Sequence, residues 1–303
     1  MSSSPSLSQA QKERIGWLKS NKAYQEAERL ADCEQHVLLF YNAEKHDVKF
    51  IPRHCQSKFC PICGPKIIAE TKRKLDYVIQ HIDQSAMRFI TLTQRDKPGE
   101  CLESAAHRFM ESFRKFRRHK SWANNIWGCY IKYEATWNKK TEAWHFHAHI
   151  LAHGRYIPRE ELKKNWMSVS PSSYIIDIRR VNKSTSHELS KYVTRLKYKG
   201  TMPLGELTRY MSKHRMVTTT GSIKKIFAAQ KENLAPSGYD YISTVDFFFS
   251  QLPMDSYSMS AYEICYHVAK LFSLNDSDPP RYAIVALDYE YRHRAQYIAE
   301  FAV

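Results

Sequence analysis

Histidines at alternating positions constrain this chain more than any other feature of its sequence. Within residues 143–153, positions 145, 147, 149 and 153 are histidine, and the residues between the first three are Phe146 and Ala148. Successive side chains of a β-strand point to opposite faces. A strand over these residues therefore places all four imidazoles on one face, with Leu151 among them, and Phe146, Ala148 and Ile150 on the other. The pattern predicts a strand with one polar, ligand-rich face and one face turned toward a core.

A second strand is expected to pair with the histidine strand. Residues 127–137 are rich in aromatic and β-branched side chains, and the polar stretch Asn138–Glu142 suits a hairpin loop. A turn centred on that loop places Glu134 opposite His147. The hairpin therefore brings a carboxylate to the histidine face.

These side chains predict a divalent-metal site. Neutral imidazole is the commonest protein ligand for such ions. We expect His147, His149 and Glu134 to be the ligands, because two imidazoles and one carboxylate leave positions open for phosphate oxygens around Mn²⁺ or Mg²⁺. His145 and His153 stay open as further ligands. The alternative for Glu134 is a surface pair with a lysine, and for the histidines a solvated polar face.

A cysteine cluster predicts a second, structural metal site. Cys60 and Cys63 have the spacing of a zinc knuckle, and Cys55 adds a third thiolate. Cys33 is the best fourth ligand, with His54 as the rival. The seven cysteines are odd in number, and a reducing compartment argues against disulfides. We therefore expect Zn²⁺ at this cluster.

A basic helix over residues 185–197 carries a candidate nucleophile. Glu188 and Tyr192 are four residues apart and share a helix face. A tyrosine can attack a phosphodiester and keep the DNA end covalently, and a nearby carboxylate can act as a general base. Tyr198 is the rival nucleophile, and the plain alternative for Tyr192 is a boundary position on a surface helix. The helix also offers three basic residues for DNA binding: Lys191, Arg195 and Lys197.

Charge separates the chain into a basic body and an acidic tail. The net charge is +15, yet residues 226–303 hold 10 Asp and Glu against 5 Lys and Arg. A basic body favours a polyanionic partner, because each neutralised phosphate releases counterions. We expect three regions: a zinc-binding region at 1–85, a domain with the histidine strand and the candidate nucleophile at 86–228, and an acidic, tyrosine-rich region at 229–303.

Composition places the chain among soluble globular proteins. Its hydrophobic content is 43%, and no apolar run approaches the roughly 20 residues of a membrane span. The N-terminus lacks the apolar core of a signal peptide, so a cytoplasmic location is expected. Helices alternate with antiparallel strands, which predicts an α+β fold. The expected helices are 8–32, 66–84, 103–118, one beginning at Pro158, and 185–197; the expected strands are two within 36–52, then 88–93, 127–137, 143–153 and 175–178.

Taken in order, these motifs resemble a known family. The order is the hydrophobic segment 89–93, Glu134, the histidine segment 144–149, and Glu188 to Tyr192, with the cysteine cluster before them and Thr219-Thr-Gly221 after them. The chain resembles the rolling-circle plasmid replication initiators of the HUH endonuclease superfamily, in the branch with one tyrosine and one glutamate. The resemblance spans roughly residues 30–225. Phe146 stands where that family usually has proline.

The resemblance implies a fold and a reaction. The sheet would be antiparallel and RRM-like, flanked by helices, with the metal on one face and the N-terminal cysteine element beside it. Tyr192 would nick single-stranded origin DNA and remain linked to the 5′ phosphate, while the free 3′ hydroxyl primes a host polymerase. Glu188 would activate water at termination. Partners would be origin DNA and host replication proteins such as a helicase and polymerase, in a bacterial cytoplasm; a homodimer is left open.

Two other classes of protein share parts of this pattern. A transposase or relaxase of the same superfamily uses the same chemistry. A zinc-containing DNA-binding regulator without catalysis would account for the basic body and the cysteines. The regulator leaves the histidine strand and the Glu188–Tyr192 pair unexplained.

Overall fold

The computed structural model describes residues 7–42, 47–171, 173, 175–182, 184–190, 203–230 and 240–244. The chain divides into two compact units, one of residues 1–15, 28–60 and 232–303 and the other of 16–27 and 61–231. The fold is α+β, as the alternation of helices and strands predicts. The domain boundaries expected at residues 85 and 228 stay a prediction.

Two helices stand where the sequence predicts one helix over residues 8–32. They are α1 (Gln9–Ser20) and α2 (Tyr24–Ala31). Lys22 adopts a positive φ of 59°, and the Asn21 side chain donates to the carbonyl of Trp17 at 2.8 Å. The side-chain amide competes with the helical backbone bonds, so the expectation of one continuous helix was wrong.

The first unit contains a small antiparallel sheet. Strands β1 (Val37–Asn42) and β2 (Asp47–Pro52) form the hairpin that the sequence predicts, and β8 (Asp240–Thr244) pairs with the other edge of β1. The order in the sheet is β2-β1-β8.

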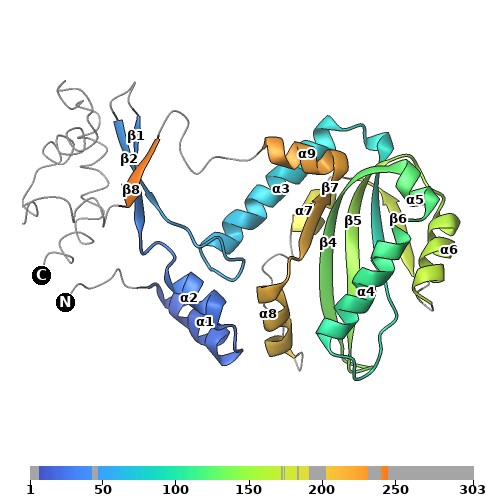
Figure 1. Ribbon diagram of the computed structural model, residues 1–303, viewed down its shortest axis with the longest axis horizontal. Coiled ribbons are helices and arrows are strands. Elements are labelled where there is room, and N and C mark those ends of the chain that lie inside the picture. The colour runs from blue at the N-terminus through green and yellow to red at the C-terminus, as the bar shows by residue number, and fades with distance from the viewer. Residues whose placement is uncertain are drawn as a thin grey trace, which may run out of the picture. The chain divides into compact units, whose positions relative to one another are not determined.

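The second unit is built on a five-stranded antiparallel sheet with the order β6-β3-β5-β4-β7 (Figure 1). β5, the histidine strand, lies at its centre, between β3 and β4. The strand bounds are β3 Met87–Thr93, β4 Ile126–Asn138, β5 Ala143–Gly154, β6 Ile176–Arg180 and β7 Val217–Thr220. A central strand has neighbours on both sides, so side chains from β3 and β4 flank each histidine.

One face of this sheet packs against an aromatic core. Helices α4 (Leu102–Phe116) and α6 (Arg159–Val169) cover it, with α5 (Lys120–Asn125) after α4. The Phe109 ring lies 5.4 Å from that of Phe146 and 5.4 Å from that of Trp166, and all three are fully buried. Burying an aromatic side chain of this kind contributes about 2 kcal/mol or more. Phe146 therefore faces the core, as the alternation predicts.

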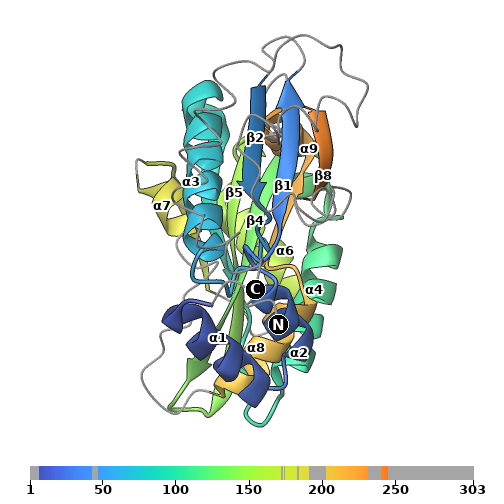
Figure 2. The same ribbon diagram turned by 90° about the vertical axis from the view of Figure 1, so that its left-hand side faces the viewer.

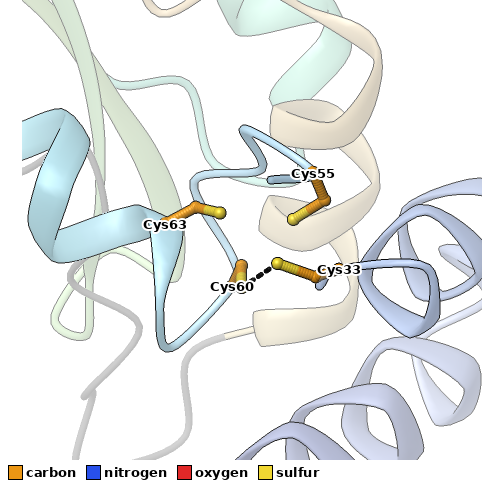
Figure 3. A group of neighbouring side chains, drawn as sticks. All are labelled: Cys33, Cys55, Cys60 and Cys63. Carbon is orange, nitrogen blue, oxygen red and sulfur yellow. Dashed lines mark hydrogen bonds between the residues drawn. The ribbon is translucent and has the colours of Figure 1, made fainter. Parts of the chain in front are cut away.

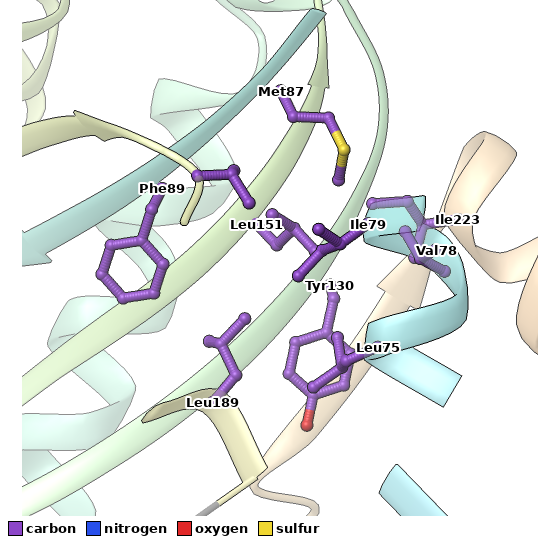
Figure 4. Close-up of a cluster of buried hydrophobic side chains, with 10 residues drawn as sticks. Leu75, Val78, Ile79, Met87, Phe89, Tyr130, Leu151, Leu189 and Ile223 are labelled. Carbon is purple, nitrogen blue, oxygen red and sulfur yellow. The ribbon is translucent and has the colours of Figure 1, made fainter. Parts of the chain in front are cut away.

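Three helices cover part of the opposite face. They are α3 (Cys63–His81), α7 (Thr185–Ser190) and α9 (Gly221–Ala229), and Figure 2 shows α7 side by side with α3. Their apolar side chains meet the sheet in one buried cluster (Figure 4). Its residues are Leu75, Val78, Ile79, Met87, Phe89, Tyr130, Leu151, Val181, Leu189 and Ile223. On β5 the cluster ends at Leu151, so His149 and His147 continue the same face beyond it.

Helix α8 (Leu204–Lys213) ties the histidine strand to α4. The Glu206 carboxylate accepts a hydrogen bond from the Trp144 indole at 2.8 Å and another from the backbone N–H of Leu102, the first residue of α4. A carboxylate at a helix N-terminus also complements the helix dipole. Among the described residues, no helix combines the length and the apolar character that crossing a membrane requires.

We predict that Gly221→Ala lowers the free energy of unfolding by about 2 kcal/mol. Gly221 has a φ of +52°, and an added Cβ would lie 1.8 Å from the carbonyl oxygen of Trp127. Thermal unfolding followed by circular dichroism measures the effect. The matched control is Gly16→Ala, within α1, where an added Cβ meets nothing within 4 Å; it should stabilise by about 0.5–1 kcal/mol. Equal stability of Gly221→Ala and wild type would contradict the prediction.

Candidate metal centres

Glu134, His147 and His149 converge on one point of the sheet. The pairing of β4 with β5 places Glu134 directly opposite His147, as the hairpin predicts. The Glu134 Oε2 atom lies 3.3 Å from His149 Nε2 and 3.8 Å from His147 Nε2. One ligand atom from each residue lies within 4.8 Å of the other two. A divalent ion replacing these mutual contacts would have two nitrogens and one oxygen as ligands.

Hydrogen bonds on the far side of each imidazole orient both rings. His147 Nδ1 lies 3.4 Å from the carbonyl oxygen of His145, which can only accept a hydrogen bond. His149 Nδ1 lies 3.1 Å from the hydroxyl of Thr91 on β3. The carbonyl contact makes Nδ1 the protonated nitrogen of His147 and leaves its Nε2 as the ligand atom, while the Thr91 hydroxyl orients the His149 ring. The donor set therefore fits a divalent ion.

The protonation states of this group also suit a metal. Burial lowers the pKa of His147 to about 4, so its imidazole is neutral at physiological pH. Burial alone would raise the pKa of Glu134, but the hydrogen bond with His149 and the charge of Lys132 outweigh it and lower that pKa to about 2. A neutral imidazole and an ionised carboxylate are the forms that bind a cation.

Lys132 is the residue of this site that the sequence interpretation did not single out. It lies opposite His149 on the same face as Glu134, and only 2% of its side chain is exposed. Its ammonium donates to Glu134 Oε2 at 3.3 Å. Burial lowers the pKa of Lys132, and the charges of Glu134 and Glu188 raise it in part. Lys132 is two residues before Glu134, a spacing that places both side chains on the same face of a strand, so the sequence did contain a signal for this residue.

His145 and His153 have partners of their own. His145 Nδ1 lies 2.7 Å from Asp96 Oδ1, and His153 Nδ1 lies 2.8 Å from the hydroxyl of Ser222. Neither belongs to the group whose ligand atoms converge. They share the face of the triad without joining it.

Glu188 is described, whereas the candidate nucleophile is not. The Glu188 carboxylate forms an ion pair with Arg179 of β6, whose guanidinium lies 4.4 Å from the centre of the Phe89 ring. This pair lies on the triad's side of the sheet, because Phe89 and Arg179 are register partners. The expected residues Lys191, Tyr192, Arg195, Lys197 and the rival Tyr198 lie outside the described residues.

The four expected cysteines come together in a second group (Figure 3). The four sulfur atoms lie within 4.8 Å of one another, those of Cys33, Cys55, Cys60 and Cys63. The Sγ atoms of Cys33 and Cys60 are 3.6 Å apart. None of the four is in a disulfide. His54 instead lies 3.5 Å from a carboxylate oxygen of Glu34.

This geometry fits a tetrahedral ion. Four thiolates at about 2.3 Å from zinc have sulfur–sulfur separations of about 3.8 Å. The hydrogen bond with Cys60 and burial raise the pKa of Cys55. Neighbouring thiols resist ionisation because the charges of the thiolates would repel one another. A bound cation compensates these charges, so ionisation of the thiols and metal binding favour each other.

Comparison with known proteins gives one consistent result. The family model described as "Replication protein" matches residues 46–263. The proteins named "Protein rep" from Bacillus amyloliquefaciens, Staphylococcus aureus and Streptococcus pneumoniae are 30%, 29% and 25% identical over 51%, 46% and 66% of this chain. The matched parts cover 50%, 68% and 70% of those relatives, so the chain spans about half the length of the first of them. No solved structure matches the chain.

We predict that His147 makes the fold less stable in acid. Its pKa falls from an ordinary 6.5 to about 4 on folding, so the unfolded chain binds more protons between these values. Stability from this group is complete above pH 6.5 and falls as the pH approaches 4, by about 3 kcal/mol at most. Denaturant unfolding from pH 8 to pH 4 measures it. In His147→Gln, the difference at pH 8 reports the lost contacts, and a slope unchanged from wild type contradicts the prediction.

We predict about one tightly held zinc ion per purified chain. Cys60→Ser should lose the zinc and unfold at a lower temperature, because three thiolates hold the ion less well. Cys101→Ser is the matched control, since Cys101 is exposed and outside the cluster. Metal content by mass spectrometry, with thermal unfolding of each variant, gives the answer. A folded wild-type chain without zinc would refute the assignment.

Proposed function

The chain belongs to the Replication protein family, and from this premise we propose that it initiates rolling-circle replication of a plasmid. It does so as a metal-dependent endonuclease and strand transferase that acts on single-stranded origin DNA. Membership of the family agrees with the resemblance that the motifs carry. A transposase or relaxase would have the same chemistry, but the relatives that the chain matches are named as replication proteins.

The convergence of Glu134, His147 and His149 supports this activity best. Three ligand atoms from two paired strands converge, and contacts at Nδ1 orient both imidazoles. An ion held by these three atoms would have further coordination positions for phosphate oxygens. A bound Mn²⁺ or Mg²⁺ would polarise the scissile phosphate and stabilise the charge that develops on it. The antiparallel sheet supports the RRM-like arrangement expected of the HUH superfamily.

The proposed reaction is a transesterification on Tyr192. The phenolic oxygen attacks the phosphorus, a bond from tyrosine to the 5′ phosphate forms, and the bond from phosphorus to the 3′ oxygen breaks. The phenolic proton passes to solvent water, and the leaving 3′ oxygen takes up a proton from solvent and becomes the hydroxyl that primes synthesis. Lys191, Arg195 and Lys197 surround this residue in the sequence and are proposed to hold the DNA backbone.

Glu188 is proposed to end the cycle by hydrolysis. Four residues before Tyr192, its carboxylate can accept the proton of a water that attacks the DNA strand at termination, so no second tyrosine is needed. The ion pair with Arg179 holds this carboxylate on the triad's side of the sheet. Its charge also raises the pKa of Lys132 in part, which supports a position near the candidate metal ligands.

The remaining parts are proposed to serve DNA binding. The cysteine cluster would hold Zn²⁺ and stiffen the N-terminal region, which presents the basic residues of α3. The proposed regions are 1–85 for zinc, 86–228 for nicking and 229–303 for a further role, in a bacterial cytoplasm. Partners would be origin DNA and host replication proteins.

We predict a covalent product between Tyr192 and DNA. The full chain is incubated with Mn²⁺ and labelled single-stranded oligonucleotides that tile its own replicon, and the products are separated on a denaturing gel. Wild type should give a protein-linked band that Tyr192→Phe loses completely, because phenylalanine has no nucleophilic oxygen. Tyr198→Phe is the matched control and should keep the band.

Zinc content and thermal unfolding show that each variant is folded. Two results would overturn the proposal: binding of the oligonucleotides without any adduct under any divalent ion, or an adduct that survives in Tyr192→Phe. Loss of the adduct in Tyr198→Phe alone would move the nucleophile to that residue.

A further inference from the structure

Lys132 occupies a position where a lysine is costly. Its side chain is 2% exposed, on the inner strand β4 between His149 of β5 and Val217 of β7. Removing an ammonium group from water is expensive unless it is paired, and an apolar side chain of similar volume is often more stable at such a place. Packing alone therefore gives no reason for a charge here.

The partner of Lys132 is the same atom that faces both imidazoles. Its ammonium lies 3.3 Å from Glu134 Oε2, and that oxygen is also the one nearest to His147 and His149. A metal ion at the triad and the ammonium would share this single oxygen. The two cations would then repel each other inside a largely water-excluded site, where such repulsion is weakly screened.

The second carboxylate near Lys132 is also compensated. Glu188 forms its ion pair with Arg179, so each carboxylate already has a cationic partner. Among the described residues, the triad and these two pairs together carry no net negative charge while the imidazoles are neutral. A divalent ion entering this group therefore meets two carboxylates whose charges a lysine and an arginine already compensate, which weakens their hold on the ion.

We propose that Lys132 makes metal binding at the triad depend on DNA. Its charge weakens the hold on a divalent ion until a backbone phosphate supplies the missing negative charge, so the ion and the DNA strand bind together. This inference rests on the proposed function, because it takes the triad to be the metal site. Lys132 acts through Glu134 and is thus a positioning residue.

The test measures Mn²⁺ binding to the zinc-loaded full chain without DNA, by calorimetry and by the electron paramagnetic resonance of free Mn²⁺. Lys132→Met keeps the volume of the side chain and removes its charge. We expect it to bind Mn²⁺ at least about tenfold more tightly than wild type. Damage to the fold would instead weaken binding, so the direction of the change separates the two causes.

Three further variants complete the set. Lys132→Gln can still donate to Glu134 and serves as the neutral variant should Lys132→Met not fold. Lys132→Arg keeps the charge and should bind Mn²⁺ about as wild type does. Lys139→Met removes an exposed lysine at the hairpin tip and should change nothing.

A second measurement adds the oligonucleotide that forms the adduct, in a Tyr192→Phe background that leaves it uncut. Wild-type Lys132 should show a large gain in Mn²⁺ affinity on DNA binding, and the neutral variants a smaller gain. Equal Mn²⁺ affinity of wild type and both neutral variants would overturn the role of Lys132 while leaving the metal site in place. Mn²⁺ binding by none of the proteins, with or without DNA, would overturn the metal site and this inference together.

Discussion

The antiparallel pairing of β4 with β5 is the constraint on which the candidate site depends. Glu134 and His147 are register partners, and so are Lys132 and His149. Because the side-chain period of a strand is two, a slip of one residue would turn Glu134 and Lys132 to the other face. The register is held from the opposite side, where Phe146 is fully buried against Phe109. Core packing thus fixes the chemistry on the reverse face of the same strand.

The face of the sheet that carries the histidines has an apolar part, which stabilises the fold, and a polar part with the candidate metal ligands. Toward Leu151, helices α3, α7 and α9 bury the sheet in an apolar cluster, which contributes to folding. Beyond it, Lys132, Glu134 and His147 are nearly as enclosed but carry charge or lone pairs. Their mutual contacts reduce the cost of burial without removing it. Apolar side chains at these positions would stabilise the fold more than the charged ones do. The charged groups are therefore candidates for a function.

Features that depend on local periodicity could be predicted from the sequence, and those that depend on packing between distant elements could not. The alternation around His147 predicts the strand, its two faces and, with a short hairpin, its pairing with Glu134. The spacing of Cys60 and Cys63 likewise predicts a knuckle, and the four cysteines do come together. The ion pair of Glu188 with Arg179 joins α7 to β6, two elements that only tertiary packing brings together. No short-range pattern encodes this contact, whereas the break at Lys22 has a local signal in the amide side chain of Asn21.

The two candidate centres differ in the kind of ion they select. Four thiolates are soft ligands that favour Zn²⁺, whereas two imidazoles and a carboxylate accept zinc as well as Mn²⁺ or Mg²⁺. A tight triad would therefore fill with the most strongly binding ion available, whether or not it suits phosphate chemistry. On the proposed function, Lys132 lowers the hold on every divalent ion equally before DNA arrives. Occupancy of the triad by an ion then depends on the phosphate oxygens of the DNA, which are hard ligands. The substrate thereby favours the binding of hard ions such as Mn²⁺ or Mg²⁺.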